Sequence, residues 1–257
     1  MFVRFLEKIG ASVLELLYFI GDVMLLFIGT LKAIPAKIRV GHIVHQMSHL
    51  GVDTLPIVSL TMMFTGMVMT LQVAHEFIKM GAESTVGGLI AIAIGRELGP
   101  VLVGVVAAGR VGSAMTAEIS TMKVTEQIDA LRVMGTNPLG YLVVPRMLAC
   151  MAMVPLLTVY GDIIGVVGGW GVARYYAGIS SYVYIDSISK YAELSDMTGG
   201  LVKALVFGIV IAVLGCYYGM KAPEGAEGVG KATTRSVVSA IVVIFMLNVF
   251  LSMVLYK

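Results

Sequence analysis

The sequence predicts an all-α integral membrane protein with an N-terminal interfacial helix, five transmembrane helices and a short cytoplasmic helix between spans two and three. Of its 257 residues, 58% are hydrophobic and 13% are charged, and the mean hydropathy is +0.93. Soluble domains carry about a quarter charged residues. Five apolar stretches also reach the roughly 20 residues that a helix needs to cross a bilayer.

The predicted spans are residues 54–75, 86–117, 146–172, 200–220 and 237–256. Residues 2–31 are also apolar, but five charged residues interrupt them. This interruption favours a helix that lies in the membrane interface over a sixth span. We therefore interpret residues 1–257 as one transmembrane domain, in which an interfacial and cytoplasmic segment (1–50) precedes the five-span bundle (51–257).

The Lys and Arg residues between the spans predict the orientation. Eleven lie in residues 1–50 and in the loops after spans two and four, against four on the other side. Because cytoplasmic loops are enriched in these residues, we expect a cytoplasmic N-terminus and, after five spans, a C-terminus on the opposite side. The net charge is only +2, and the Lys and Arg residues are scattered between apolar blocks, so no nucleic-acid partner is expected.

No metal site, cofactor or disulfide framework is predicted. Cys150 and Cys216 lie in apolar segments, where a thiol behaves as a small hydrophobic group. His42, His45 and His49 have the spacing of metal ligands, but no Cys, Asp or Glu lies among them. A weakly basic helix face at the membrane surface is the favoured interpretation.

Residues 225–231 match the glycine and lysine spacing of a phosphate-binding loop. Ala232 replaces the Ser or Thr that would bind magnesium, however, and a membrane span precedes the segment instead of a strand. A flexible cytoplasmic loop is therefore expected. Covalent catalysis is not expected either, since all four histidines precede residue 77 and Ser113 lies within a helix.

Charged residues interrupt the second span at Arg96-Glu97-Leu98-Gly99-Pro100. Ionised groups at membrane depth are costly and usually line a cavity or a protein interface. On a helical wheel Glu97 lies within roughly 20° of Gly104 and Ala108, which with Gly112 form a small-residue seam suited to close helix contact.

Pro100 has no N–H to donate to the carbonyl of Arg96, so an acceptor without its helical partner is expected beside the Glu97 carboxylate. We interpret Arg96 and Glu97 as a site for a charged or zwitterionic headgroup at a cavity or a seam between subunits. The alternative is that both residues pair with neighbouring helices and stabilise the fold.

Span one carries an apolar stripe near the far membrane face. Met69, Val73, Phe77 and Met80 follow one another at helical spacing. Methionine side chains adapt to flexible ligands, so the stripe could form the wall of a pocket for acyl chains. Plain core packing or lipid contact is the alternative. The glycines at spacing four in spans three and four are expected to pack helices within one subunit.

A short charged helix is predicted after span two, within residues 121–135. Thr125 is expected to cap it, and Gly135 is expected to end it. The acidic Glu126 and Asp129 lie near its N-terminus and the basic Arg132 near its C-terminus, in the order that suits the helix dipole. Its apolar edge consists of Ile128, Leu131 and Met134. Such a short helix needs a partner surface, either a protein groove or the membrane surface.

Five segments carry ordered motifs, namely residues 96–100 (RELGP), 108–114 (AGRVGSA), 116–119 (TAEI), 125–131 (TEQIDAL) and 232–235 (ATTR). This set resembles the MlaE (YrbE-type) permease family of lipid ABC transporters, along nearly the whole chain. The resemblance implies a homodimer in the bacterial inner membrane with a cytoplasmic N-terminus and a periplasmic C-terminus. It also implies cytoplasmic ABC ATPase subunits, a periplasmic Mce-type lipid-binding ring, and transport of phospholipid between the inner and outer membranes.

By the same resemblance, Glu97, Leu98 and the far end of span one line a lipid pocket at the dimer seam, and the segment from Glu126 to Met134 contacts the ATPase. The coupling residues would be Thr125, Glu126, Gln127, Asp129, Arg132 and Met134. Two alternatives from other classes stay open. One is a secondary transporter in which Glu97 exchanges protons, and the other is a membrane scaffold without transport activity, in which the buried charges are structural.

Overall fold

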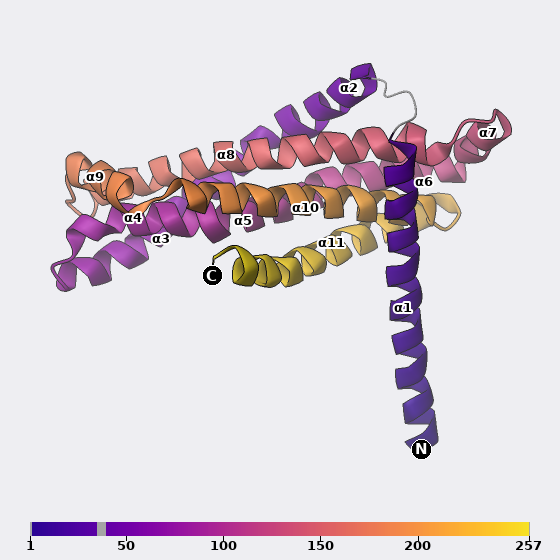
Figure 1. Cartoon of the computed structure of the whole chain (residues 1–257), viewed down its shortest axis with the longest axis horizontal. Coiled ribbons are helices and arrows are strands. Elements are labelled where there is room, and N and C mark those ends of the chain that lie inside the picture. The colour runs from indigo at the N-terminus through magenta and orange to yellow at the C-terminus, as the bar shows by residue number, and fades with distance from the viewer. Residues whose placement is uncertain (1, 35–39, 257) are drawn as a thin grey trace.

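The computed structural model describes residues 2–34 and 40–256, with side chains for 10–34 and 41–256, and nearly all of these residues are helical (Figure 1). The α-helices are α1 (Phe2–Ala33), α2 (Val40–Gly51), α3 (Leu55–Lys79), α4 (Val86–Ala93), α5 (Gly99–Ala107), α6 (Ser113–Val124), α7 (Gln127–Val133), α8 (Val144–Tyr175), α9 (Ser181–Tyr191), α10 (Leu194–Met220) and α11 (Gly225–Leu255). The all-α prediction is confirmed.

Short turns of other helix types connect several of these helices. Two are 3-10 turns, η1 (Val52–Thr54) and η2 (Glu83–Thr85). The other three are π-helical turns, η3 (Ile94–Leu98), η4 (Ala108–Gly112) and η5 (Leu139–Val143). Predicted span two is thus one long helical stretch from α4 to α6 that contains two π-turns, η3 and η4. Such π-turns are frequent at functional sites.

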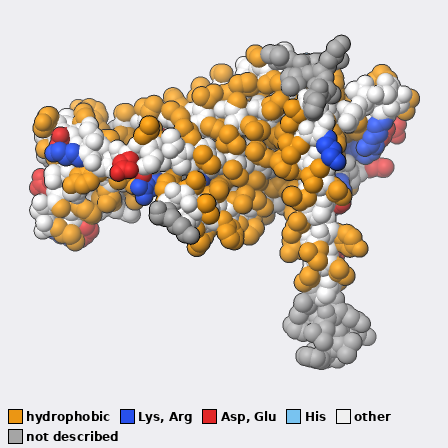
Figure 2. All heavy atoms as spheres, in the orientation of Figure 1, with side chains coloured by type: hydrophobic (Ala, Val, Ile, Leu, Met, Phe, Trp, Pro, Cys, Tyr) orange, Lys and Arg blue, Asp and Glu red, His pale blue; other side chains and the backbone are white. Residues whose placement is uncertain are grey.

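The chain is a multi-pass membrane protein. Six helical stretches in the described residues are long and apolar enough to cross a membrane. Five of them match the predicted spans, the last of which ends one residue earlier than predicted, at Leu255, and the sixth is Gly10–Ala33 in α1. Figure 2 shows apolar side chains over the middle of the bundle, with most charged side chains towards its two ends. Helix α1 leaves one end of the bundle and projects away from it (Figure 1), and its interfacial position stays a prediction.

Helix α8 lies at the centre of the bundle, packed against α2, α3, α5 and α10. Glycines permit this close approach. A Cβ atom on Gly66 of α3 would lie 1.9 Å from the carbonyl oxygen of Gly165 in α8, and one on Gly208 of α10 would lie 2.6 Å from the carbonyl oxygen of Cys150. The prediction that the glycines of spans three and four pack helices within one subunit is confirmed.

The small residues of span two also pack within the chain. A Cβ on Gly104 would lie 3.3 Å from the ring of Phe207 in α10, and one on Gly112 would lie 3.3 Å from Ile211. Ala108 between them is fully buried. These residues therefore pack against α10 and α11 within the chain. A role for Gly104, Ala108 and Gly112 at a seam between two copies stays a prediction.

The prediction of a flexible loop at residues 225–231 is wrong. Helix α11 begins at Gly225, whose φ of +83° directs the chain into the helix. Glu227 and Lys231 form an ion pair of 2.6 Å one turn apart, which supports the first turns. The glycines that match a phosphate-binding loop are therefore helical.

Candidate functional site

The charged motif of span two lies on the π-turn η3, where Pro100 removes one backbone donor. The carbonyl of Arg96, which would accept from residue 100 in a regular helix, accepts instead from the Nζ of Lys203 at 2.8 Å. The predicted unpaired acceptor is thus present, and a lysine of α10 satisfies it.

Lys203 joins this carbonyl to the Glu97 carboxylate. Its Nζ lies 2.8 Å from Glu97 Oε1 and 2.8 Å from the Oγ of Ser252, so all three N–H groups have an acceptor. The Ser252 hydroxyl donates to Glu97 Oε1 at 2.8 Å, and Asn248 Nδ2 donates to Oε2 at 2.9 Å. Asn248 and Ser252 lie one turn apart on the same face of α11.

A second ion pair borders this network. Arg96 pairs with Asp196 at 2.5 Å, and Asp196 lies in the first turn of α10, where it caps the helix by accepting from the backbone N–H of Glu193. The ring of Tyr256 lies 4.8 Å from the Arg96 guanidinium and 4.8 Å from Lys203 Nζ, within cation–π range. We call Arg96, Glu97, Asp196, Lys203, Asn248, Ser252 and Tyr256 the Glu97 cluster.

The Glu97 cluster has two cations and two anions, and its members differ in exposure. The Lys203 side chain is 0% exposed, whereas the Glu97 side chain is 40% exposed. The pairing that sequence reasoning gave as the structural alternative is therefore present within one chain, and the Glu97 carboxylate still has an open side. A polar group next to it could contact this carboxylate without breaking the Lys203 pair.

The apolar stripe of span one divides in the structure. Met69, Val73 and Phe77 are partly buried and pack against the same hydrophobic cluster as Leu98, between α3, α4, α8 and α9. Met80 follows the end of α3 and is exposed. Three of the four residues thus have core contacts within the chain, and Leu98 joins them while Glu97 faces α10 and α11.

Sequence reasoning missed the partners of Glu97. Lys203 is an ionisable residue inside a predicted span, which is itself a signal of a functional or paired position. Asn248 and Ser252 are polar residues one turn apart in the last span. These signals mark candidate positions, but the pairing of α10 and α11 with η3 connects residues more than 100 positions apart.

The short charged helix after span two is present as α7. Ile128 is fully buried and packs with Leu131 in a small cluster that includes Ile119 and Leu142. Asp129 accepts from Lys123 at 2.8 Å and from Arg132 at 2.8 Å. The hydrogen bond from Lys123 is the main reason that the pKa of Asp129 lies below its ordinary value of 3.8. The chain leaves α7 through Gly135 at φ +71°, as expected.

The predicted capping role of Thr125 is wrong. Its hydroxyl donates to the carbonyl of Thr121 at 2.8 Å, so Thr125 ends α6 instead of starting α7. Glu126 precedes α7 in the left-handed conformation at φ +59°, which is uncommon for a residue other than glycine. Val133, the last residue of α7, is 89% exposed, and Met134 directly after it is 68% exposed, so this end of the segment presents apolar groups.

These features define a multi-pass membrane protein with a charged cluster within the bundle and an exposed helical element at one end. A model of the family described as "Permease MlaE" matches residues 43–254. The chain is 43% identical to a probable ABC transporter permease protein of Synechocystis sp., over 88% of this chain and 86% of that protein. It is 38% identical to another from Rickettsia prowazekii, over the whole of both chains.

It is also 37% identical to the Arabidopsis thaliana protein TRIGALACTOSYLDIACYLGLYCEROL 1, chloroplastic, over 86% of this chain and 63% of that protein. The chain belongs to the MlaE permease family of ABC transporters. It is a transport subunit rather than an enzyme.

Proposed function

We propose that this chain is the permease subunit of an ABC transporter that moves phospholipid between the inner and outer membranes of a bacterium. The partly exposed Glu97 carboxylate carries the proposal, because its helix leads directly to α7. Two copies of the chain form the working unit, with the open sides of their Glu97 clusters facing a shared lipid pocket. The name of the Arabidopsis relative contains that of a galactolipid, which supports a lipid substrate.

The Glu97 cluster is suited to a lipid headgroup. A zwitterionic or charged headgroup finds both signs of charge there, since Arg96 and Glu97 are each more than one third exposed. Leu98, Met69, Val73, Phe77 and Met80 form the apolar wall for the acyl chains. The free energy of binding acyl chains scales with the buried apolar area and does not depend on direction. Headgroup preference therefore depends mainly on Arg96 and Glu97.

The route of coupling runs along α5, η4 and α6. From Glu97 to Val124 this helical stretch covers about 40 Å at 1.5 Å per residue, and α7 follows directly. Residues 121–135, with Thr125, Glu126, Gln127, Asp129, Arg132 and Met134, contact the cytoplasmic ATPase. Movement of α7 on ATP binding shifts α6 and α5, and the pocket beside Glu97 narrows and releases lipid.

The orientation of the bundle in the membrane follows from the position of α7. Helix α1 projects sideways from the α7 end of the bundle (Figure 1), which supports an interfacial helix on the cytoplasmic side of the inner membrane. The opposite end, where α9 lies, then faces the periplasm and a lipid-binding ring of Mce type. The C-terminus after α11 is on the periplasmic side.

Reconstitution tests the role of Glu97. The Glu97→Gln variant keeps the shape of the side chain, removes its charge and replaces one of its two acceptor oxygens with an NH2 donor. We expect it to lower ATP-driven transfer of a fluorescent phospholipid between proteoliposomes and acceptor protein at least tenfold. Glu76→Gln is the matched control, because Glu76 forms an exposed pair with Lys79 on α3 and is expected to transport at the normal rate. Normal transport by Glu97→Gln would contradict the pocket assignment.

The same vesicles separate the alternatives. Lipid transfer that follows a proton gradient without ATP would favour a proton-coupled transporter that uses Glu97. The absence of transfer under either condition, with the ATPase bound and active, would favour a scaffold in which the Glu97 cluster is structural. Transfer only with ATP supports the ABC mechanism.

A further inference from the structure

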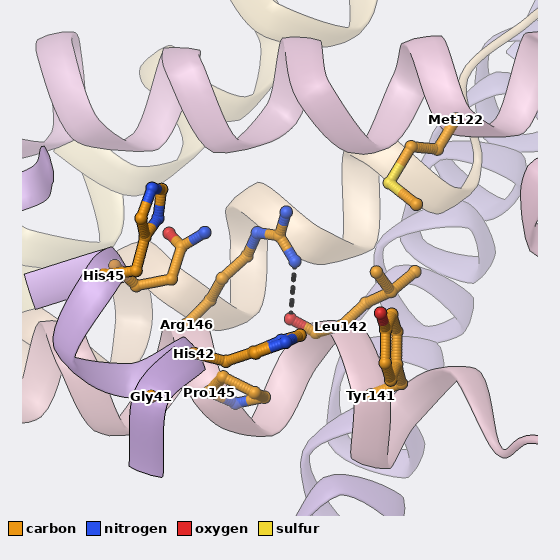
Figure 3. Close-up of a pocket in the computed structure, with 9 residues that line it drawn as sticks. Gly41, His42, His45, Met122, Tyr141, Leu142, Pro145 and Arg146 are labelled. Atoms are coloured by element: carbon orange, nitrogen blue, oxygen red, sulfur yellow. Dashed lines mark hydrogen bonds between the residues drawn. The ribbon is translucent and has the colours of Figure 1, made fainter. Parts of the chain in front are cut away.

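A second polar site lies at the base of α7, apart from the Glu97 cluster. It is a cavity of about 430 Å³ between α2, the end of α6 and the segment from η5 to the start of α8 (Figure 3). Its position is fixed by the helices that enter and leave the α7 segment, since Met122 precedes α7 and Tyr141 follows it. The lining residues are Gly41, His42, His45, Gln46, Met122, Tyr141, Leu142, Pro145 and Arg146.

Arg146 is the buried cation of this cavity, only 6% exposed. One guanidinium nitrogen donates to the carbonyl of Leu142 at 2.8 Å, the bond drawn in Figure 3, and another donates to Glu118 Oε2 at 2.6 Å. The third nitrogen, Nε, is buried and has no hydrogen-bond partner among the side chains and backbone that the structure describes. An unsatisfied buried N–H of a charged group is costly, so a bound acceptor at this nitrogen would be stabilising.

Further donors come from α2. His42, His45 and Gln46 supply two imidazoles and an amide on the other side of the cavity from α8, and the ring of His42 lies edge-on to Tyr141 at 5.6 Å. Among the described lining residues there is no carboxylate, and Glu118 contacts the Arg146 guanidinium without lining the cavity. Met122, Leu142 and Pro145 add an apolar wall.

We propose that this cavity binds a phosphate group, carried either by a lipid headgroup or by a small soluble anion. A phosphate has three or more acceptor oxygens that can meet donors from two helices at once, whereas a carboxylate has two oxygens. The volume lies within the range of about 300–1,000 Å³ that is usual for small-molecule sites. Because Glu118 balances the charge of Arg146, the empty cavity carries no unpaired cation. The proposal does not depend on the Glu97 cluster or on transport.

Selective labelling makes the test direct, because the sequence has four histidines, His42, His45, His49 and His75. The full-length chain, labelled at the histidine rings, is purified in a phosphate-free maltoside detergent. It is then titrated at constant pH and ionic strength with inorganic phosphate and, separately, with dihexanoyl phosphatidylglycerol. We expect a saturable shift of the His42 and His45 ring signals with at least one probe and none with chloride.

His49 and His75 are internal controls, since neither lines the cavity. The exposed His45 and the partly buried Gln46 of α2 are changed in place of the buried Arg146, which the fold needs. We expect His45→Ala with Gln46→Ala to weaken binding about tenfold through the loss of hydrogen bonds to a charged group, and His49→Ala to leave it unchanged. Saturation with inorganic phosphate identifies a soluble anion, and saturation with the lipid alone identifies a headgroup. No saturation with either probe, equal shifts at all four histidines, or full affinity in the double variant overturns the proposal.

Discussion

Lys203 is the residue on which the Glu97 cluster depends for stability. It is fully buried and donates all three N–H groups, to Arg96, Glu97 and Ser252. We expect Lys203→Met to lower the free energy of unfolding by about 3 kcal/mol, the lower end for breaking a buried ion pair, because Glu97 is partly exposed. Thermal or denaturant unfolding in detergent measures the change.

Lys190→Met is the control for this prediction. Lys190 pairs with Asp186 one turn away on α9, and its side chain is 66% exposed, so its loss should change stability by less than about 0.5 kcal/mol. The double variant Lys203→Met with Glu97→Gln should be more stable than the sum of the two single effects predicts, because it removes both charges. Strict additivity would mean that the pair does not contribute as a unit.

The ionisation of Asp129 should be insensitive to pH over the neutral range. Its pKa lies below 3.8, chiefly because Lys123 donates a hydrogen bond to it. A lowered folded pKa adds stability above the unfolded pKa, and that stability is lost as the pH falls through the folded value. A titration of the carboxyl carbon by NMR should show a midpoint below 3.8 that rises towards it in Lys123→Met, whereas a midpoint unaffected by Lys123→Met would contradict the assigned cause.

Sequence reasoning reached Glu97 but not its partners, and the reason is physical. A charged motif in a span is visible from local hydropathy, and the wheel angle gives the face of the helix. Which residue meets that face depends on the packing of α10 and α11, which no local pattern encodes. Thr125 illustrates the same limit, because a hydroxyl near a helix start can instead bond back one turn and end the preceding helix.

At the scale of elements, α8 offers a comparison between two nearby glycines. A Cβ on Gly168 would lie 2.5 Å from the carbonyl oxygen of Met63 in α3, whereas one on Gly171 meets nothing within 4 Å. We expect Gly168→Ala to destabilise the protein by about 1–3 kcal/mol through overpacking. Gly171→Ala should be neutral or stabilising by up to about 1 kcal/mol, since alanine favours the helix. Equal effects in unfolding experiments would show that the contact between α3 and α8 is not this close.

The spans were predictable because twenty apolar residues have few alternatives to a membrane helix. The π-turns were not, because local hydropathy does not show where a helical turn widens. In η3 the Arg96 carbonyl accepts from a lysine of another helix, a contact that only the folded chain provides. Helix α11 extends through the expected loop at 225–231 because it packs against α6 and α10. The exposed pair of Glu227 and Lys231 adds only about 0.2–0.5 kcal/mol, less than the glycines cost. Composition gives the elements, and tertiary contacts decide their ends.

At the scale of the whole molecule, one helical stretch separates the Glu97 cluster from α7. Variants of the cluster and variants of α7 should therefore lose different activities. We expect Glu126→Lys with Asp129→Lys to lose the ATPase on co-purification, because both acidic residues lie on α7 or directly before it and Asp129 also orders Lys123 and Arg132. Glu227→Lys is the control at the same end, on α11, where Glu227 is exposed, and it should keep the ATPase.

Glu97→Gln should show the opposite behaviour, with the ATPase retained and hydrolysing ATP while lipid transfer is lost. This separation follows because the described hydrogen bonds and ion pairs of the cluster run to α10 and α11 and not to α7, so removal of one charge leaves the surface of α7 unchanged. If Glu97→Gln also releases the ATPase, the two ends form a single structural unit. The cluster would then support α7 directly, and the proposed transmission through α5 and α6 would have to be abandoned.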